Sequence, residues 1–244
     1  MKIIEIEGLV VSSIKYKESS KIINILTKDK LIGVIAKGAL KIKSKLRIIS
    51  DNLTYARFNI YYKEKGLSTL IEGDIIDDFK NIKTNLKLIS YASYLIDLST
   101  QIFKQEENQN IYNLLITSLK KIDGGLNPLG ISNIMELKML SFLGIDLNLK
   151  ECVKCGKKEV TNISTLYGGY ICQDCDEGEY PYSKKMLRII KTYHDVDLEK
   201  INLIDVSKET EDEINKFLDN YYEEYSGLYL KTKSFLKNVN KLPN

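Results

Sequence analysis

The first eighty residues alternate between apolar and polar positions with the two-residue period of β-strands. The strand-like runs cover residues 3–14, 21–27, 31–36, 53–62 and 67–76. Turn signals at residues 28–30 and 64–66 separate consecutive runs. Five strands in so short a segment predict a small closed barrel, for which the OB-fold is the common five-stranded form and an SH3-like barrel is the other.

The period becomes helical after Asp77 and Asp78. Apolar residues then step by three and four along residues 81–104, which predicts one long amphipathic helix. Similar patterns predict helices at 111–122, from Asn127 to about 144, from Ser183 to 193, after Thr210, and at 231–238. Thr210 and Glu213 resemble a capping box at the start of the acidic helix.

All four cysteines lie in one segment, as two Cys-x-x-Cys pairs formed by Cys152, Cys155, Cys172 and Cys175. Two such turns facing each other offer four thiolates in a tetrahedron, the geometry of a structural Zn²⁺ site with no open position for a substrate. Two disulfides would need an oxidising compartment, and a redox-active Cys-x-x-Cys normally occurs once. We therefore predict one structural Zn²⁺ as the cofactor.

Together these patterns predict an α+β multidomain protein. An N-terminal five-stranded OB-fold β-barrel would occupy residues 1–79, and an α-helical domain would occupy 80–244, with a four-cysteine zinc finger inserted at about 150–178. A hydrophobic content of 43% and a charged content of 28% are typical of globular proteins. No apolar run approaches the ~20 residues of a membrane span, and no signal peptide is visible, so we expect a cytoplasmic protein without a membrane partner.

The formal net charge is only +3, so the distribution of charge matters more than its total. No acidic residue occurs between Asp29 and Asp51, although this stretch is rich in lysine. Long cations on a barrel loop neutralise phosphates and release counterions, whereas the simpler interpretation is that they only solubilise the loop. The expected DNA-binding residues are Lys37, Lys41, Lys43, Lys45 and Arg47, with Lys15, Lys17 and Lys21 on an earlier turn.

Tyrosines on the predicted fourth strand provide candidate stacking surfaces for bases. Tyr55, Tyr61 and Tyr62 occur there, and aromatic platforms beside basic grooves are typical of barrels that bind single strands. A tyrosine on a half-buried strand is more often part of the core or its rim. Both interpretations remain open for these three residues.

The residues offer no plausible active site. His194 is the single histidine and lies at the apparent end of a helix, so Cys–His pairs and histidine-based hydrolytic zinc sites are excluded. No phosphate-binding loop of the Gly-x-x-x-x-Gly-Lys-Ser/Thr type occurs. Asp77 and Asp78 are adjacent, so their side chains point apart, and a domain junction is their expected role. We predict a protein that is not an enzyme.

Several segments together resemble the bacterial recombination mediator family RecO, and the resemblance runs over nearly the whole chain. It is most specific in the first forty residues. The segments are 8–11, 16–22, 26–27, 31–38 with the basic run to Arg47, 66–70, 91–94, the four cysteines, and 233–236.

The resemblance implies an OB-fold, a helical C-terminal domain and a zinc finger. It also implies binding to single- and double-stranded DNA and annealing of complementary strands. The implied partners are RecR, RecF in some settings, RecA, and the acidic C-terminal tail of single-strand-binding protein. Lys37, Lys41, Lys43, Lys45 and Arg47 match the family's basic loop. The leading hypothesis is a non-enzymatic mediator of recombination and DNA repair, associated with the nucleoid.

Two other functions stay open at this point. One is a zinc-stabilised adaptor that docks proteins and touches nucleic acid only incidentally. The other is a cysteine-based redox or metal enzyme, which would need reactive thiols in the metal-loaded protein.

Overall fold

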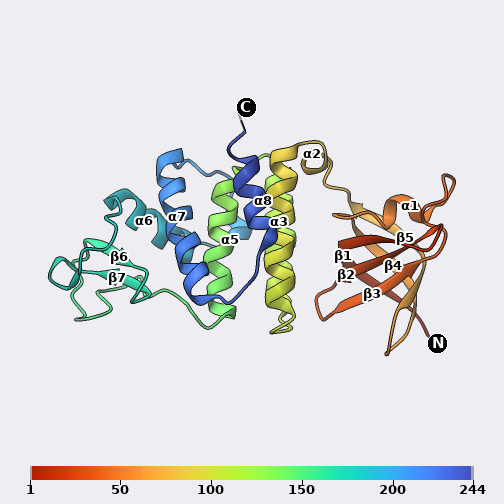
Figure 1. Ribbon diagram of the computed structural model, residues 1–244, viewed down its shortest axis with the longest axis horizontal. Helices are drawn as coiled ribbons and strands as arrows, with labels where there is room; N and C mark the ends of the chain where they lie inside the picture. Colours follow the sequence, from red (N-terminus) through yellow and green to blue (C-terminus); the bar gives the residue numbers. More distant parts are fainter. Residues whose placement is uncertain (1, 243–244) are drawn as a thin grey trace.

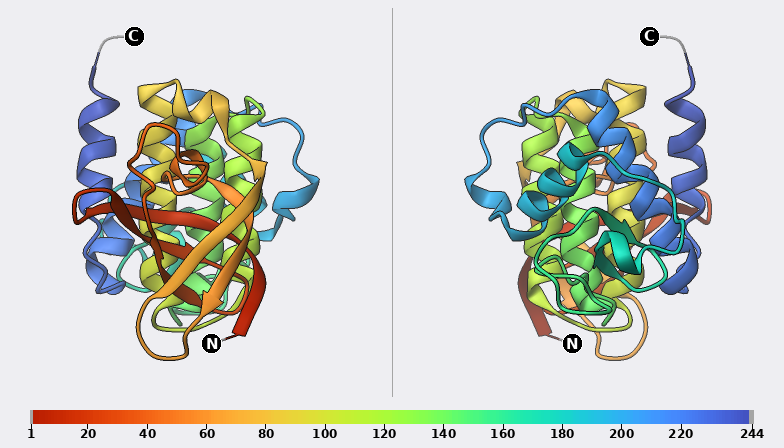
Figure 2. Two further views of the ribbon diagram at one scale, coloured as in Figure 1. Left: turned by 90° about the vertical axis from the view of Figure 1, so that its right-hand side faces the viewer. Right: turned by 90° about the vertical axis from the view of Figure 1, so that its left-hand side faces the viewer.

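A computed structural model describes residues 2–242. The molecule is elongated, with a β-barrel at one end of the long axis, a group of helices in the middle and a small module carrying the four cysteines at the other end (Figure 1). The two end-on views show the barrel and this module on opposite faces of the helical layer (Figure 2). Charged loops at the two ends are therefore separated by the whole helical region.

Five strand pairings close the barrel in the order β1-β2-β3-β5-β4. Only the pairing of β3 with β5 is parallel, and the other four are antiparallel. This topology confirms the five-stranded OB-fold expected from the alternating pattern. The strands are β1 (Lys2–Tyr16), β2 (Ser20–Leu26), β3 (Leu31–Ala36), β4 (Tyr55–Tyr62) and β5 (Ser68–Asp77). A short helix, α1 (Leu46–Ile49), lies between β3 and β4. β1 closes the barrel because its first half pairs with β4 and its second half with β2, with a register shift between Val10 and Ser12.

The barrel core follows the two-residue period of the sequence. Ile23 and Ile25 of β2, Val34 of β3, and Phe58 and Ile60 of β4 are completely buried. Alternate residues point outward, as a pleated strand requires. On β4 the interior face therefore carries Phe58 and Ile60.

The helical region begins with two helices where the sequence pattern predicted one. α2 (Lys80–Lys83) and α3 (Leu86–Phe103) are separated because Asn85 is extended and its side chain accepts hydrogen bonds from the backbone N–H groups of Lys87 and Leu88. Asparagine competes well for this N-cap role, so the helix starts anew there. The later helices are α4 (Gln109–Asp123), α5 (Pro128–Phe142), α6 (Lys184–Asp195), α7 (Lys208–Tyr225) and α8 (Lys231–Val239).

Most predicted helix starts are confirmed, but the capping box is wrong. Asn127 caps α5 and Ser183 caps α6 through their side chains. α7, however, begins at Lys208, and Ser207 is its N-cap residue. Thr210 lies inside the first turn and is buried, with its hydroxyl 3.1 Å from that of Ser207. The Ser-Lys-Glu sequence starts the helix one turn earlier than the predicted box.

A buried cluster of ion pairs holds the C-terminal helix α8 against α5 and α7. Lys233 Nζ lies 2.7 Å from Glu136 on α5 and 2.9 Å from Asp219 on α7. Burial alone would lower the pKa of Lys233, but the two carboxylates raise it above its usual value. Removing the lysine would leave buried carboxylate charge uncompensated, so this cluster fixes where α8 packs.

The four-cysteine module (residues 150–178) is inserted between α5 and α6. It contains a two-stranded ribbon of β6 (Asn162–Ser164) and β7 (Gly169–Ile171) and the 3-10 turn η1 (Gln173–Cys175). Gly168 adopts a left-handed φ of +65° in the connection, as expected for a hairpin. A second 3-10 turn, η2 (Leu198–Lys200), connects α6 towards α7.

The barrel joins the helices through an apolar contact on one side. Leu9, Leu26 and Leu53 of the barrel belong to the same buried cluster as Phe79 and Ile82 of the connecting segment. At the junction, Asp77 accepts a hydrogen bond from the backbone N–H of Phe79, and Asp78 pairs with Lys83 of α2. The two aspartates thus have the junction role expected from the sequence.

Candidate nucleic-acid surface and metal centre

The basic loop (residues 37–47) leaves the barrel where β3 ends. Its backbone is ordered by successive turns, because the N–H of Lys41 bonds the carbonyl of Gly38, that of Ser44 bonds Lys41, and that of Arg47 bonds Ser44. Ala39 is fully buried beneath the loop and anchors it to the barrel. The exposed cations of the loop are Lys37, Lys41, Lys43, Lys45 and Arg47.

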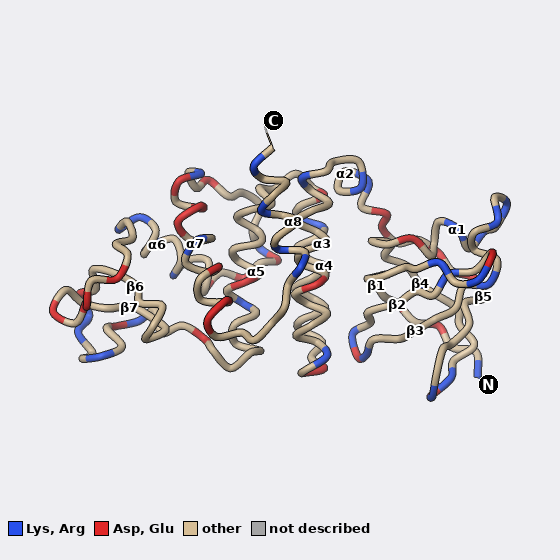
Figure 3. The backbone as a smooth tube through the Cα atoms, viewed as in Figure 1, with Lys and Arg blue, Asp and Glu red and all other residues tan. Residues whose placement is uncertain are grey.

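Figure 3 shows these cations gathered around α1 at the end of the barrel that faces away from the helices. The salt bridges within residues 2–242 involve none of them. Unpaired, exposed cations on an ordered loop are available to polyanions. The structure therefore brings the five predicted loop residues onto one accessible surface.

The three predicted extensions of this surface have different environments, and the first of them, Lys15, is exposed near the end of β1. Lys17 is exposed on the β1–β2 turn, with its ammonium 5.5 Å from the ring centre of Tyr16. Lys21 is only 9% exposed, and its ammonium pairs with Asp51 and contacts the carbonyl of Arg47 at 3.4 Å. Lys21 thus holds the end of the basic loop against the barrel instead of presenting a free charge.

The three tyrosines of the fourth strand do not form a platform beside the basic loop. Tyr55 is buried against the helices, and its hydroxyl donates to Glu7; burial and this hydrogen bond raise its pKa to about 12. Tyr62 lies under the ammonium of Lys30, 4.3 Å from the ring centre. Tyr61 is exposed but pairs with the N-terminal end of β1. For Tyr55 the core interpretation is correct.

The four cysteines converge in the module as their spacing predicted. The sulfur atoms of Cys152, Cys155, Cys172 and Cys175 all lie within 4.8 Å of one another, and those of Cys155 and Cys172 are 3.6 Å apart. A tetrahedron with metal–sulfur bonds of about 2.3 Å has edges of about 3.8 Å, so the observed spacing fits a four-coordinate metal ion. Gly156 has a φ of +75°, which allows the tight knuckle after the second cysteine.

The electrostatics of the thiols also favour a bound cation. Burial raises the pKa of Cys152, but hydrogen bonds from backbone N–H groups together outweigh this effect and lower the pKa to about 6. Hydrogen bonding to the sulfurs of Cys155 and Cys172 raises the pKa of Cys175 to about 12. Four thiols this close do not all ionise unaided, because each thiolate disfavours the next. The donor set therefore fits a dication that neutralises them.

The lysines next to the cysteines are paired within the module. Lys154 forms an ion pair with Glu177, and Lys157 with Asp174. Their charge is already balanced locally, so it adds little to the field outside the module. Both carboxylates are distant in sequence from the lysines that they pair with, so the sequence did not indicate these ion pairs.

A basic groove of about 1050 Å³ lies between the module and α6, and the sequence analysis missed it. Its apolar floor includes Leu149, Tyr170 and Leu187, all at most 6% exposed. Among its lining residues Asp195 is the one acid. The cations that line it are Lys150, Lys158, Lys184, Arg188 and Lys191.

Part of this groove had a signal in the sequence. Lys184, Arg188 and Lys191 follow the four-then-three spacing of one helical face. The opposite wall comes from the module, and no sequence pattern indicated that the two would meet. Lys191 also contacts the carbonyl of Leu149 at 3.2 Å, which ties α6 to that wall.

His194 occupies the predicted position at the end of α6. Its ring nitrogens lie 2.9 Å from Asp195 and 3.1 Å from Asp146. Both nitrogens are engaged by carboxylates that orient the ring at the helix terminus. This contact joins α6 to the segment after α5.

The barrel, the helices and the inserted module define the class as a multidomain protein with an N-terminal OB-fold and an insertion whose four clustered cysteines could hold a metal ion. Residues 1–79 match the family described as "Recombination protein O N terminal", and residues 83–234 match "Recombination protein O C terminal". The chain belongs to the recombination protein O (RecO) family, whose members are DNA repair proteins.

Full-length relatives agree with the two family matches. The chain is 37% identical over 246 residues to "DNA repair protein RecO" of Bacillus pumilus (strain SAFR-032), covering 98% of this chain and 96% of that protein. It is 34% identical to the protein of the same name from Listeria innocua, and 33% identical to that of Bacillus velezensis, each covering 98% of this chain and 95% of the relative. Within residues 2–242, no helix is both long and apolar enough to cross a membrane.

Proposed function

We propose that this chain is a non-enzymatic, DNA-binding mediator of recombination in DNA repair. In this proposal it binds single- and double-stranded DNA and anneals complementary strands. Together with RecR it helps to load RecA onto single strands coated by single-strand-binding protein. It would act in the cytoplasm, associated with the nucleoid.

The observation that carries the proposal is the basic loop. Five cations are exposed on an ordered loop of an OB-fold, and no carboxylate lies in the sequence between Lys30 and Ser50. Each phosphate that such a loop neutralises releases counterions, which gives affinity without sequence preference. Lowering the charge on two complementary strands also lets them approach each other.

The basic groove supports the docking of a protein partner at the opposite end of the molecule. Cations around an apolar floor suit a short acidic segment that also carries apolar residues, and we propose the acidic C-terminal tail of single-strand-binding protein as its occupant. A peptide with that chemistry, labelled with a fluorophore, should bind the protein with an affinity that Arg188→Glu lowers about tenfold. An unchanged affinity would remove the groove from the proposal.

RecF is a further proposed partner, and no surface is assigned to it.

We further propose that the module holds one structural Zn²⁺ through Cys152, Cys155, Cys172 and Cys175. Four cysteine ligands fill a tetrahedral ion, so the metal would supply shape and no open coordination position. The thiols would then be unreactive in the loaded protein. Thiol titration in the native and the unfolded state would reveal any reactive cysteine.

The alternative function is a zinc-stabilised adaptor with only incidental nucleic-acid contact. The basic groove is the observation that favours it, because this surface fits a protein segment. The two functions predict different binding of the protein to bare oligonucleotides. An adaptor binds them weakly at physiological salt, whereas a mediator binds and pairs them.

An annealing assay separates the two functions. Complementary oligonucleotides, one of them coated with cognate single-strand-binding protein, are mixed with the zinc-loaded protein across a series of salt concentrations. The mediator should accelerate annealing by an order of magnitude or more at low salt, and the effect should fade as salt rises. No acceleration at any salt, with zinc confirmed by metal analysis, would favour the adaptor.

A further inference from the structure

Three isoleucines form a row across the outer face of the barrel. Ile14 of β1 is directly paired with Ile22 of β2, and Ile22 is directly paired with Ile35 of β3. Directly paired residues lie on the same face of a sheet. Because the alternating residues Ile23 and Val34 are buried inside the barrel, the row points outward. Ile14 is 60% exposed, so nothing within residues 2–242 covers this end of the row.

The basic loop lies on one side of this row, further along the strands. Lys37 follows Ile35 by two residues, a distance of about 7 Å along an extended strand. The loop is tied to the same edge, since the N–H of Gly38 donates to the Ser20 hydroxyl at 3.3 Å and that of Leu40 donates to the carbonyl of Ser19 at 2.8 Å. An apolar row therefore lies directly beside the unpaired cations.

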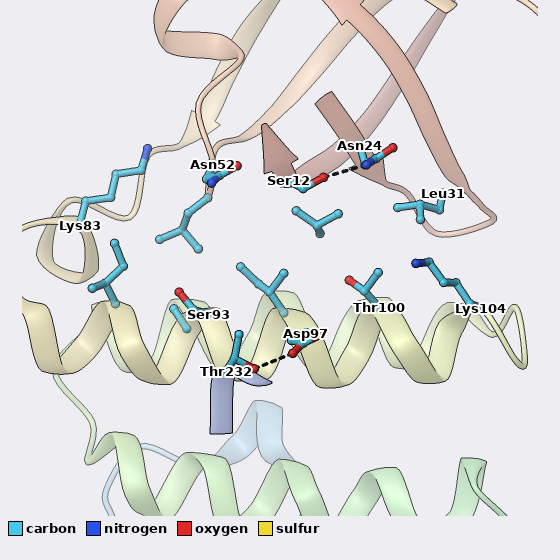
Figure 4. Close-up of a pocket in the computed structure, with 15 residues that line it drawn as sticks. Ser12, Asn24, Leu31, Asn52, Lys83, Ser93, Asp97, Thr100, Lys104 and Thr232 are labelled. Carbon is cyan, nitrogen blue, oxygen red and sulfur yellow. Dashed lines mark hydrogen bonds between the residues drawn. The ribbon is translucent and has the colours of Figure 1, made fainter. Parts of the chain in front are cut away.

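A cleft between the barrel and α3 lies on the opposite side of the row. The next cross-strand pair is Ser12 and Asn24, joined by a 2.7 Å hydrogen bond, and both residues line the cleft (Figure 4). The cleft has a volume of about 450 Å³, within the range of pockets that hold small molecules. The exposed Lys104 lies at one end of the cleft in this view.

The far wall of the cleft carries an unused polar group. The Thr100 hydroxyl of α3 is buried and has no hydrogen-bond partner within residues 2–242. Buried polar groups without a partner are uncommon, and one that lines a cleft is available to a ligand. Apolar residues from both walls, among them Leu31 and Ile96, complete the lining. The cleft thus offers apolar contact, the Thr100 hydroxyl and the cation of Lys104, while the carboxylate of Asp97 in its wall accepts a hydrogen bond from Thr232.

We propose that a single strand of nucleic acid runs from the basic loop across Ile14, Ile22 and Ile35 and enters the cleft between the barrel and α3. The proposal rests on the DNA-binding function and specifies the path of the strand. Its phosphates lie along the loop cations and Lys104, and its bases lie against the isoleucines. An aliphatic row accepts any base, because every base has an apolar face.

The path distinguishes single strands from duplexes. In a duplex the faces of the bases are stacked on one another, so only the phosphates are available to this surface. The isoleucines then strengthen the binding of single strands and leave duplex binding to the cations. This difference gives the row a signature that a general electrostatic surface lacks.

The test compares two isoleucines of the same strand. Ile14→Ser removes the exposed member of the row, and Ile3→Ser changes an isoleucine of similar exposure, 56%, at the other end of β1. Neither site is in the core, and equal melting temperatures confirm that both variants fold. Affinities for a mixed-sequence single strand and for a blunt duplex are measured by fluorescence anisotropy over a salt series.

Ile14→Ser should weaken single-strand binding about fivefold to tenfold, with the salt slope unchanged and duplex binding within twofold of wild type. Ile3→Ser should bind both DNAs like wild type. The path is overturned if Ile14→Ser binds single strands normally, loses both DNAs equally, or behaves like Ile3→Ser. If the wild-type protein itself shows no salt-dependent DNA binding, the proposed function fails together with the path.

A second pair of variants tests the cleft. Lys104→Gln should reduce the salt slope for single strands by about 0.7, the contribution of one phosphate contact, without changing the slope for duplexes. Lys87→Gln, at the other end of α3 and outside the cleft lining, should change neither slope. Equal slopes for the two variants on single strands would remove the cleft from the path.

Discussion

The basic loop and the four-cysteine module are both rich in lysine, but the structure uses their lysines in opposite ways. In the loop, Lys41 and Lys43 are exposed and stand far in sequence from any carboxylate. In the module, Lys154 and Lys157 are paired with Glu177 and Asp174. The loop therefore directs its charge outward, whereas the module neutralises its own.

The two regions also differ in what keeps them ordered. The loop is held by backbone hydrogen bonds and by the buried Ala39, so it needs no ligand to keep its shape. Ile163 and Tyr170 of the module's ribbon pack into the main core, but the module's own cluster, around Cys152 and Cys172, is small. So small a core does not offset the conformational entropy of about thirty ordered residues without a further cross-link. Lysine content alone thus indicates neither a binding surface nor a stable segment.

Removal of the metal should affect the two regions most unequally, and this is the largest effect we expect. Apparent binding free energies of structural zinc in small fingers are about 10–16 kcal/mol, so its loss should unfold the module. Chelation should deprotect residues 150–178 in hydrogen exchange and lower the melting temperature of the helical region. DNA affinity at the basic loop should stay within about twofold.

Two cysteine variants provide the control for a metal effect. Cys172 is buried and Cys155 is exposed, so a loss of packing alone would affect Cys172→Ser and spare Cys155→Ser. Loss of a shared metal should destabilise both to a similar extent and reduce bound zinc in both. Retention of the folded module in the metal-free protein would contradict the structural role.

The order of elements could be predicted because it depends on local periodicity. Five strands, their inward faces and the main helices follow from alternation and from steps of three and four residues. The errors are at helix boundaries. Asn85 divides a run that is helical by pattern, because its side chain caps α3. α7 starts before Thr210, at Ser207, whose side chain makes no cap hydrogen bond. Periodicity reports neither boundary.

The candidate sites likewise differ in whether their residues are close in sequence. The four cysteines and the five loop cations are each close in sequence, and both groups were predicted. The role of Lys21 was not, because its partner Asp51 comes from another turn of the barrel. The cleft and the basic groove could not be predicted, since each has walls from elements that meet only in the folded chain. The burial of Tyr55 has the same origin.

Neutralising matched sets of lysines should sharpen the contrast between loop and module. We expect the change of Lys41, Lys43 and Arg47 to glutamine to weaken duplex binding at least tenfold and to lower the salt slope by about 2.7, since each lost phosphate contact contributes about 0.9. Lys154→Gln with Lys157→Gln should lower the slope by less than 0.5. Salt-titrated anisotropy measures both variants.

Equal salt slopes for the two sets of variants would contradict the proposed difference between the basic loop and the module. A large loss in the module variant would mean that Lys154 and Lys157 exchange their carboxylate partners for phosphates. A normal slope in the loop variant would remove the basic loop from the DNA-binding surface. Bound zinc is measured in each sample, so that loss of the module is not mistaken for loss of charge.

The smallest effect concerns Lys21 and Lys17, which belong to the same predicted surface but differ in burial. Lys21→Met should lower the free energy of unfolding by about 1 kcal/mol, because it removes a half-buried ion pair with Asp51. Its salt slope for duplex DNA should equal that of wild type. Lys17→Met should leave stability unchanged and lower the slope by about 0.9 if this exposed cation contacts a phosphate.

Urea unfolding and salt-titrated anisotropy measure the two quantities on the same samples. A lower slope in Lys21→Met with unchanged stability would show that Lys21 leaves Asp51 when DNA binds, and the ion pair would then be a feature of the free protein alone. The expected results in both variants would place the edge of the DNA surface at the β1–β2 turn, with Lys17 inside it and Lys21 beneath it. Burial, and not the type of residue, would then set where the binding surface ends.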